Sequence, residues 1–486
     1  MTEKLRRIAV DPVTRVEGHG KITLLLDEAN HVHEARFHIV EFRGFEKFIQ
    51  GRPYWEAPYF VQRLCGICPV SHHLAAGKAV DQLAGVDTLT PTATKLRRLL
   101  HFGQILQSHA LHFFHLSSPD LLFGFGSNLE HRNIVGVIED YPDLALKGVK
   151  LRKFGQQVIE VIAGKRIHGA AAIPGGMNKS LTTPERDRLL ADIDEVLGWA
   201  EDAVVLNEKI HMEHPENHGF GSFASNYLSM VGSDGELELY HGGLRASRSD
   251  GSRVFDQFDY RGYSEKIREE VRSWSYMKFP YLTDLGRDTG WYRVGPLARV
   301  NNCDYISTPL AEEARKRFKA FANGGFVHDT LAYHWARMIE ALHCAESIRD
   351  LLHDPEILGN DLIVEGERQE EGIGVIEAPR GTLFHHYQVN DDGTIKKANL
   401  IVSTTSNNQA MNESVRSVAN AYLDGNEITE GLLNHLEVAI RAYDPCLSCA
   451  THALGKMPLQ VELHAADGSL LDRIAKGSNG TITRTL

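Results

Sequence analysis

The sequence lacks several features that would assign it to other classes of protein. It has no apolar run of the roughly 18 residues needed to cross a membrane, and Arg6-Arg7 precedes an apolar stretch too short for a signal peptide. Basic residues are in the minority, since 52 Lys and Arg against 64 Asp and Glu give a net charge of −12, and they form no block. We therefore expect a cytoplasmic protein with no nucleic-acid partner and no direct membrane contact.

Cysteine is scarce, with six in 486 residues, but four of the six form two Cys-x-x-Cys pairs near opposite ends of the chain: Cys65/Cys68 and Cys446/Cys449. Thiols stay reduced in the cytoplasm, which favours metal binding over disulfides. Two such pairs supply four soft sulfur ligands. The spacing alone leaves a structural zinc, an iron–sulfur cluster and a catalytic metal centre open.

The apolar periodicity predicts a mainly helical chain with small antiparallel β-sheets, of the α+β class. The content of 42% hydrophobic and 24% charged residues is that of a globular protein with enough apolar material for a deep core. The helical patterns cover residues 91–118, 142–163, 183–211, 309–321, 329–352, 409–423 and 429–443. The strand patterns cover residues 5–10, 20–40 (a hairpin), 374–378, 382–389 and 396–404.

No composition shift divides the chain sharply. We expect one large domain over residues 1–452, followed by an extension over residues 453–486. Within the domain, the patterns indicate a β-hairpin region at 1–45, a helical core at 85–355 and a β/α region at 372–452.

Further motifs accompany the cysteine pairs. In chain order, the five motifs are Asp11-Pro12-Val13-Thr14-Arg15-Val16-Glu17-Gly18-His19, Phe42-Arg43-Gly44-Phe45-Glu46, Gln62-Arg63-Leu64-Cys65-Gly66-Ile67-Cys68 with His72 after it, Ala378-Pro379-Arg380-Gly381, and Asp444-Pro445-Cys446-Leu447-Ser448-Cys449-Ala450-Thr451-His452. With these motifs in this order, the chain resembles the catalytic large subunit of nickel–iron hydrogenases over essentially its whole length. The segments 40–48 and 377–383 make it most similar to the cytoplasmic, bidirectional NAD-reducing type. The fold implied is that of the large subunit, with a central bundle of long helices.

The resemblance implies a nickel–iron centre bound by the four thiolates. Cys65 and Cys446 would be terminal nickel ligands, while Cys68 and Cys449 would bridge nickel to iron. The iron would carry carbon monoxide and cyanide, which no side chain can supply. The activity implied is the reversible heterolytic oxidation of dihydrogen to protons and electrons, with the thiolate of Cys446 as the first proton acceptor.

Two catalytic side chains are implied beside Cys446. Glu17 would be the next proton carrier. A carboxyl group near the thiolate, buried and with a raised pKa, can relay protons near neutral pH. For an arbitrary glutamate, a helix cap or a surface salt bridge is the ordinary interpretation. Arg380, after Pro379, would bind the nitrogen of one cyanide through its guanidinium. Thr404 would offer a hydroxyl to the other cyanide, although the neighbouring hydroxyls of the Ser-Thr-Thr-Ser run leave the choice among them open.

The resemblance also implies residues that support these groups. His72 would donate a hydrogen bond to a bridging sulfur, as outer groups around metal sites do; a core histidine is the alternative. Asp120 and Asp444 would be carboxylates around Arg380, and for Asp120 a helix-end aspartate explains the residue equally well. The clusters His109/His112/His115 and His385-His386 receive no ligand role.

The carboxyl end carries two further predictions. Glu46 and His452 would bind a magnesium ion that joins the two ends of the domain, with zinc or iron left open because histidine is an unusual magnesium ligand. A maturation endopeptidase would cut between His452 and Ala453 once nickel-insertion factors have loaded the site. An ordinary folded end is the alternative for residues 453–486.

Electron transfer requires partners, because Cys303 and Cys344 cannot hold a cluster on their own. By resemblance, these partners are an iron–sulfur hydrogenase small subunit, which receives the electrons, and flavin-containing diaphorase subunits that meet NAD. An NADP- or deazaflavin-linked hydrogenase, or a hydrogen-sensing regulatory subunit, is the alternative. A structural zinc protein would contain zinc and no nickel.

Overall fold

The computed structural model of the protein describes residues 6–10, 13–27, 31–39, 41–128, 130–423, 430–451, 459–464, 470–476 and 482–484. The helices are α1 (Phe45–Phe48), α2 (Ala57–Phe60), α3 (Pro69–Leu83), α4 (Pro91–Leu111), α5 (Ser118–Phe123), α6 (Ile134–Asp140), α7 (Pro142–Ala163), α8 (Thr183–Leu190), α9 (Ile193–Glu213), α10 (Tyr263–Lys266), α11 (Gly286–Thr289), α12 (Pro296–Asn302), α13 (Pro309–Phe321), α14 (Ala332–His353), α15 (Ser403–Ser406), α16 (Asn408–Tyr422) and α17 (Glu430–Ala442). The mainly helical fold class is confirmed.

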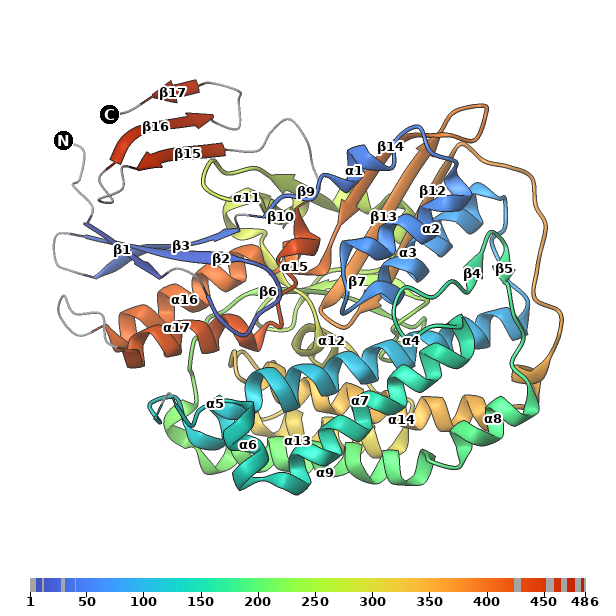
Figure 1. The fold of residues 1–486 in the computed structure, drawn as a ribbon, viewed down its shortest axis with the longest axis horizontal. Helices are drawn as coiled ribbons and strands as arrows, with labels where there is room; N and C mark the ends of the chain where they lie inside the picture. The colour runs from blue at the N-terminus through green and yellow to red at the C-terminus, as the bar shows by residue number, and fades with distance from the viewer. Residues whose placement is uncertain are drawn as a thin grey trace.

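Four long helices, α4, α7, α9 and α14, pack side by side and form a bundle in the lower half of the molecule as drawn in Figure 1. The helix α4 begins where Thr90 accepts a hydrogen bond from the N–H of Ala93, with Pro91 in the first turn. It approaches α7 closely at a pair of glycines: a Cβ on Gly155 would lie 2.6 Å from the carbonyl oxygen of Gly103. The expected bundle of long helices is therefore present.

The strands form small sheets, which lie above this bundle in the view of Figure 1. An antiparallel sheet joins β1 (Arg6–Val10), β2 (Gly20–Leu26) and β3 (Val32–Ile39), and a second joins β12 (Glu371–Ala378), β13 (Gly381–Val389) and β14 (Ile395–Ile401). A four-stranded sheet has the order β11 (Tyr292–Arg293), β6 (Asn226–Val231), β7 (Gly243–Ser247) and β8 (Arg253–Phe258). The remaining sheets pair β4 (Ala172–Ile173) with β5 (Gly176–Met177), β9 (Ile267–Glu270) with β10 (Phe279–Leu282), and β15 (Leu459–His464) with β16 (Leu470–Lys476) and β17 (Ile482–Arg484).

Three helices, α3, α16 and α17, connect the sheets to the site. The helix α3 lies against β12 and β13, and α16 lies against β3 with α17 beside it (Figure 1). Cys65 and Cys68 precede α3, whereas Cys446 and Cys449 follow α17. The packing of α3 and α17 therefore carries the two cysteine pairs toward one another.

The sequence predicted most of the long helices and several strands, with four differences. The strand expected at 396–404 ends at Ile401, and Ser403 and Thr404 belong to the helix α15. The long helix expected at 183–211 is two helices, α8 and α9, and α8 opens with a reciprocal cap between Thr182 and Glu185. The helix expected at 91–118 changes at His112–Ser117 into a wider π-helical turn before α5. The helix α3 was not predicted at all.

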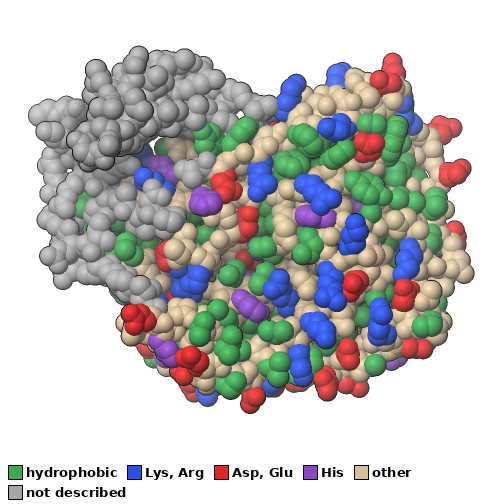
Figure 2. All heavy atoms as spheres, viewed as in Figure 1, with side chains coloured by type: hydrophobic (Ala, Val, Ile, Leu, Met, Phe, Trp, Pro, Cys, Tyr) green, Lys and Arg blue, Asp and Glu red, His purple; other side chains and the backbone are tan. Residues whose placement is uncertain are grey.

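Among the described helices, none has the length and apolarity of a membrane span. Figure 2 shows one face of the molecule, on which basic and acidic side chains are interspersed.

Candidate metal centre

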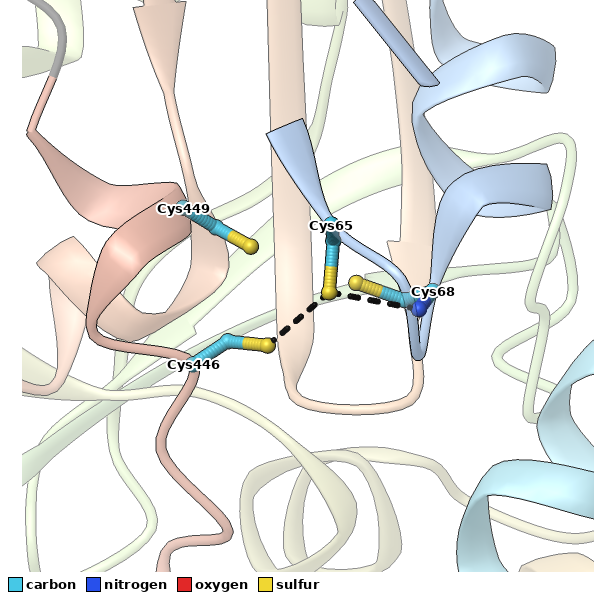
Figure 3. A group of neighbouring side chains, drawn as sticks. All are labelled: Cys65, Cys68, Cys446 and Cys449. Carbon is cyan, nitrogen blue, oxygen red and sulfur yellow. Dashed lines mark hydrogen bonds between the residues drawn. The ribbon is translucent and has the colours of Figure 1, made fainter. Parts of the chain in front are cut away.

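The four paired cysteines converge in one place. Their sulfur atoms all lie within 4.8 Å of one another, and Figure 3 shows the four side chains pointing toward a common centre. The sulfurs of Cys65 and Cys446 are 3.2 Å apart. The N–H of Cys68 donates to the Cys65 sulfur at 3.4 Å, and the thiol of Cys449 donates to the carbonyl of Leu64 at 3.2 Å. The two cysteine pairs therefore meet in space, as the metal interpretation requires.

Electrostatics make this cluster a site for a soft cation. All four cysteines are buried. Hydrogen bonds to the neighbouring sulfurs raise the pKa of the Cys446 thiol, and burial raises the pKa of the Cys449 thiol. Hydrogen bonds from the other three cysteines instead lower the pKa of Cys68. The cluster without a metal thus favours one thiolate, whereas a thiophilic metal deprotonates its thiol ligands and neutralises their charge. Four thiolates suit a soft or borderline metal, a group that includes nickel, zinc and iron.

A small cavity adjoins Cys68 and Cys446. Its walls combine apolar side chains with a guanidinium, an imidazole and hydroxyls: His72, Ala378, Pro379, Arg380, Leu383, Val402, Ser403 and Thr404 line it with the two cysteines. Diatomic ligands need such a mixture, since carbon monoxide is apolar and cyanide accepts hydrogen bonds. The lining therefore fits a metal with diatomic ligands next to Cys68 and Cys446; Cys449 is not among the residues that line this cavity.

Arg380 lies at the tight turn between β12 and β13. Its Nη2 donates to Oδ1 of Asp444 at 2.8 Å and its Nε donates to the Asp444 carbonyl at 2.5 Å. Burial alone would lower the pKa of Arg380, but Asp444 and the cysteine sulfurs raise it well above its ordinary value. Arg380 is therefore a permanent cation at the cavity wall. Asp444 adopts a left-handed backbone with φ of 53°, which is uncommon outside glycine, and it precedes the second cysteine pair directly.

The structure distinguishes among the hydroxyls of α15. The backbone N–H of Cys446 donates to Oγ1 of Thr404 at 3.0 Å, so the hydroxyl hydrogen of Thr404 remains available toward the cavity. The hydroxyl of Ser403 also lines the cavity, but it already donates to the carbonyl of Gly381 at 2.6 Å. Of the two hydroxyls that line the cavity, that of Thr404 is therefore the one whose hydrogen is available toward it.

Glu17 contacts the turn that holds the second cysteine pair. Its carbonyl accepts from the N–H of Leu447 at 3.0 Å, and its carboxylate accepts from the N–H of Ser448 at 3.1 Å and from the Ser448 hydroxyl. Glu17 is only half-buried, because it lies between this turn and the surface. The carboxyl group of Glu17 is therefore next to the turn that carries Cys446 and Cys449, and it is also accessible to solvent.

The expected role of Asp120 beside Arg380 is wrong. Among the described residues, Asp120 pairs with Arg15 at 2.6 Å and with Arg441 at 2.9 Å, and Arg132 lies 3.6 Å away. Its ion pairs therefore join the Glu17 segment, α5 and α17, while Asp444 alone takes the carboxylate role next to Arg380. The motifs could not separate the two aspartates, because each precedes or follows a helix end in the sequence.

His72 lies in the second turn of α3 and lines the cavity beside Cys68. Its interaction with Cys68 helps to lower the pKa of that thiol. Its Nδ1 lies 3.1 Å from Nε2 of His385, at hydrogen-bond distance. His385 in turn contacts the hydroxyl of Tyr387. The sequence drew attention to His385 but gave it no role, and it gave no signal for Tyr387.

Sequence reasoning also missed the arginine that supports the hairpin of Arg380. Arg299 of α12 donates to the carbonyls of Ala378 and Pro379 at 2.9 and 3.3 Å, and it pairs with Glu340 and Glu377. All three charged side chains are buried. The sequence offered one signal for Arg299: a charged residue within a short helical segment that has no polar face.

The predicted magnesium site is described only in part. Glu46 lies at the start of the chain's α1 and accepts the N–H of Leu400 at 2.9 Å; burial raises its pKa. His452 and Ala453 lie outside the described residues. The carbonyl of Thr451 accepts the N–H groups of Arg43 and Gly44 at 3.1 and 3.3 Å, so the chain just before His452 lies beside the segment that carries Glu46.

These features define a class of protein: a mainly helical protein with a buried site for a metal bound by four cysteines. The sequence profile of the family described as "Nickel-dependent hydrogenase" matches residues 43–122 and 239–452, and a profile described as "HoxL-like" matches residues 7–42. The chain belongs to the nickel-dependent hydrogenase family and is a catalytic large subunit of that family.

Individual relatives agree with this assignment. The subunit beta of the NAD-reducing hydrogenase HoxS from Cupriavidus necator is 49% identical over 97% of this chain and 100% of its own length. The corresponding chain of the F420-non-reducing hydrogenase vhc from Methanococcus voltae is 41% identical over 96% of this chain and 99% of its own length. A solved NAD+-reducing nickel–iron hydrogenase in the H2-reduced state matches with a TM-score of 0.90 and 56% identity, over 93% of this chain and 100% of that one. The nickel–iron–selenium hydrogenase of Dm. baculatum, at 23% identity and a TM-score of 0.74, shares the fold.

Proposed function

We propose that this chain is the subunit in which dihydrogen is reversibly converted into protons and electrons, with NAD as the distal electron acceptor. The observation that carries the proposal is the convergence of four buried cysteine sulfurs within 4.8 Å, from both ends of the chain. The choice of NAD is supported by the 49% and 56% identity to proteins whose names state NAD reduction.

Four residues would hold the nickel–iron centre. Cys65 and Cys446 would bind nickel terminally, and Cys68 and Cys449 would bind nickel and bridge to iron. The iron, with its carbon monoxide and cyanide ligands, would occupy the cavity against Pro379 and Arg380. When bound, this centre supplies the heterolytic cleavage of dihydrogen.

Side chains of this protein would bind the ligands of the metal centre, orient one another and accept protons next to it. The Arg380 guanidinium and the Thr404 hydroxyl would donate hydrogen bonds to the two cyanide nitrogens, and Asp444 orients Arg380 for this role. His72 would donate to the sulfur of Cys68. The sulfur of Cys446 would take the first proton and pass it to the carboxylate of Glu17, whose half-buried position gives it access to solvent.

Electrons need a partner to leave this chain. Within the described part of the chain, the four cysteines are the only cluster of at least three metal-ligating side chains, and burial raises the pKa of the thiols of both Cys303 and Cys344. An iron–sulfur small subunit would therefore receive the electrons, and flavin-containing diaphorase subunits would deliver them to NAD. Because NAD is an intracellular acceptor, the assembly would be cytoplasmic.

The carboxyl end would take part in maturation. Residues 1–452 would form the catalytic domain, in which Glu46 and His452 hold magnesium. After nickel-insertion factors load the centre, an endopeptidase would cut between His452 and Ala453 and remove residues 453–486. The intact mass of the nickel-loaded protein should correspond to a chain that ends at His452; a mass that includes Leu486 would exclude cleavage.

The function is tested by metal analysis of the purified complex together with acceptor assays. We expect bound nickel, and hydrogen-dependent reduction of NAD in preference to NADP or a deazaflavin. Cys449→Ala should abolish nickel binding and activity, whereas Cys303→Ala, at a buried thiol outside the cluster, should keep both. Zinc without nickel in the unaltered protein would contradict the proposal.

A further inference from the structure

A hydrogen-bonded row of three side chains leads away from the cavity, behind His72. His385 and Tyr387 lie two residues apart on β13, so their side chains share one face of the sheet. That face packs against α3, which carries His72. The distances are 3.1 Å from Nδ1 of His72 to Nε2 of His385, and 2.6 Å from Nδ1 of His385 to the hydroxyl of Tyr387. All three residues are fully or almost fully buried.

The direction of these hydrogen bonds follows from the far end of the row. Tyr387 lies among apolar side chains of α3, β13 and β14, and burial raises the pKa of its hydroxyl well above its ordinary value, so the hydroxyl keeps its proton. Among the described residues, its hydrogen-bond partner is Nδ1 of His385. A buried hydroxyl that donates to no acceptor costs about 1–3 kcal/mol, so the O–H of Tyr387 donates to Nδ1 of His385.

This first bond determines the next two. With its Nδ1 accepting, a neutral His385 carries its proton on Nε2 and donates it to Nδ1 of His72. His72 then carries its own proton on Nε2, the nitrogen that does not face His385. His72 and Cys68 line the same cavity, and their interaction lowers the pKa of the Cys68 thiol. The opposite direction would leave the Tyr387 hydrogen without an acceptor and would turn a nitrogen lone pair toward a thiolate.

We propose that Tyr387 and His385 are positioning residues that fix the tautomer of His72, so that its Nε2–H is directed at the sulfur of Cys68. The inference rests on the proposed function, in which Cys68 bridges the two metals. A hydrogen bond to a thiolate ligand stabilises the reduced, more negative state of a metal site and raises its reduction potential. Two residues that touch neither metal nor cavity therefore contribute to the potential of the centre.

The test is the midpoint potential of the nickel electron paramagnetic resonance signal in the purified complex. His385→Leu removes the donor to His72 and should lower the midpoint potential by about 59 mV. This shift corresponds to about a tenfold change in the equilibrium constant of a one-electron reduction. Tyr387→Phe should lower it in the same direction and by less, because the geometry of the imidazoles is kept. His385→Gln, whose amide can still donate to His72, should restore most of the potential.

His386→Gln is the matched control. His386 is the next residue on β13 and faces the other way, toward Tyr263 and Glu371, so its substitution should leave the potential unchanged. An unchanged potential in both His385→Leu and Tyr387→Phe would overturn the inference. The signal comes only from nickel-loaded molecules, so incomplete loading does not obscure the result. Absence of nickel from the unaltered complex would instead count against the proposed function.

Discussion

At the scale of single residues, Glu17 depends on contacts between two segments far apart in the chain. Both its carbonyl and its carboxylate bind the turn between Cys446 and Cys449. Its position is therefore set by the same turn that positions the proposed proton-accepting thiolate, so that movement of one group is accompanied by movement of the other.

Glu17→Gln separates proton transfer from metal binding. Glutamine can still accept the N–H of Ser448, so we expect unchanged nickel content, but it cannot carry a proton as a carboxylate does. Hydrogen/deuterium exchange should fall by about 100-fold or more. Glu41→Gln is the control, since that carboxylate lies nearby and pairs with His19 at 2.6 Å. A normal exchange rate in Glu17→Gln would remove Glu17 from the mechanism.

Arg299 is a second residue whose removal should have a large effect. Burial raises the pKa of Glu340, but the charge and hydrogen bonds of Arg299 outweigh it and lower that pKa to about 2. Arg299→Met leaves Glu340 and Glu377 buried without their partner and should cost about 3–5 kcal/mol of unfolding free energy. Urea unfolding can be compared with Arg317→Met, which breaks a surface pair with Glu208 and should cost less than about 1 kcal/mol. Equal losses would contradict the prediction.

At the scale of elements, the closeness of α3 to β12 depends on two glycines. A Cβ on Gly374 would lie 2.0 Å from the carbonyl oxygen of Ala75, and one on Gly372 would lie 2.1 Å from that of Ala79. No side chain fits between the helix and the strand at these points. The approach holds the amino end of α3, with Cys68 and His72, against the hairpin of Arg380.

Gly374→Ala should therefore displace α3 from the sheet. We expect lower stability and reduced nickel loading, because Cys68 moves relative to the second cysteine pair. The nickel content per chain and the thermal midpoint measure the two effects. Gly198→Ala, on an exposed part of α9 with no atom near the added Cβ, should instead stabilise the protein by about 0.5–1 kcal/mol. Full nickel loading in Gly374→Ala would show that the close approach is not needed.

The same helix shows what the sequence could not predict. In α3 every residue except Gln82 is buried, so no polar stripe produces a helical period, and buried side chains such as Lys78 and Asp81 interrupt the apolar pattern. Lys78 is satisfied by the carbonyls of Tyr240 and Val375, and Asp81 by Arg97. These partners are distant in sequence. By contrast, α7 and α13 each keep an exposed face and were predicted with their observed bounds.

At the scale of the whole molecule, the same distinction applies to the site. The cysteine pairs, Glu17 and Arg380 belong to contiguous motifs and could be predicted. The supporting residues Arg299 and Tyr387 carry no motif, because their roles arise from which helix packs on which strand. For the same reason, the sequence placed both Asp120 and Asp444 beside Arg380, whereas among the described residues Asp444 pairs with Arg380 and Asp120 pairs with Arg15 and Arg441.

Deep burial also gives the whole molecule a predictable acid sensitivity. Burial lowers the pKa of His73, His101, His109 and His343 to about 4 in each case. Since the unfolded chain binds these protons near pH 6.5, the unfolded state holds more protons than the folded state between pH 6.5 and 4. The stability that these histidines contribute is therefore complete above pH 6.5 and is lost as the pH falls toward 4.

His343→Gln isolates one of these groups. Glutamine can keep the hydrogen bond that His343 makes with the Thr308 hydroxyl at 2.9 Å, but it does not titrate. Proton uptake on unfolding in guanidinium should then be about one proton smaller than in the unaltered protein at pH 5.3, and equal to it at pH 7.5. Nickel thiolates released on unfolding take up protons at both values, so the comparison between variants cancels them. Equal uptake at pH 5.3 would mean that His343 is already charged in the folded protein, and the histidine account of acid sensitivity would fail.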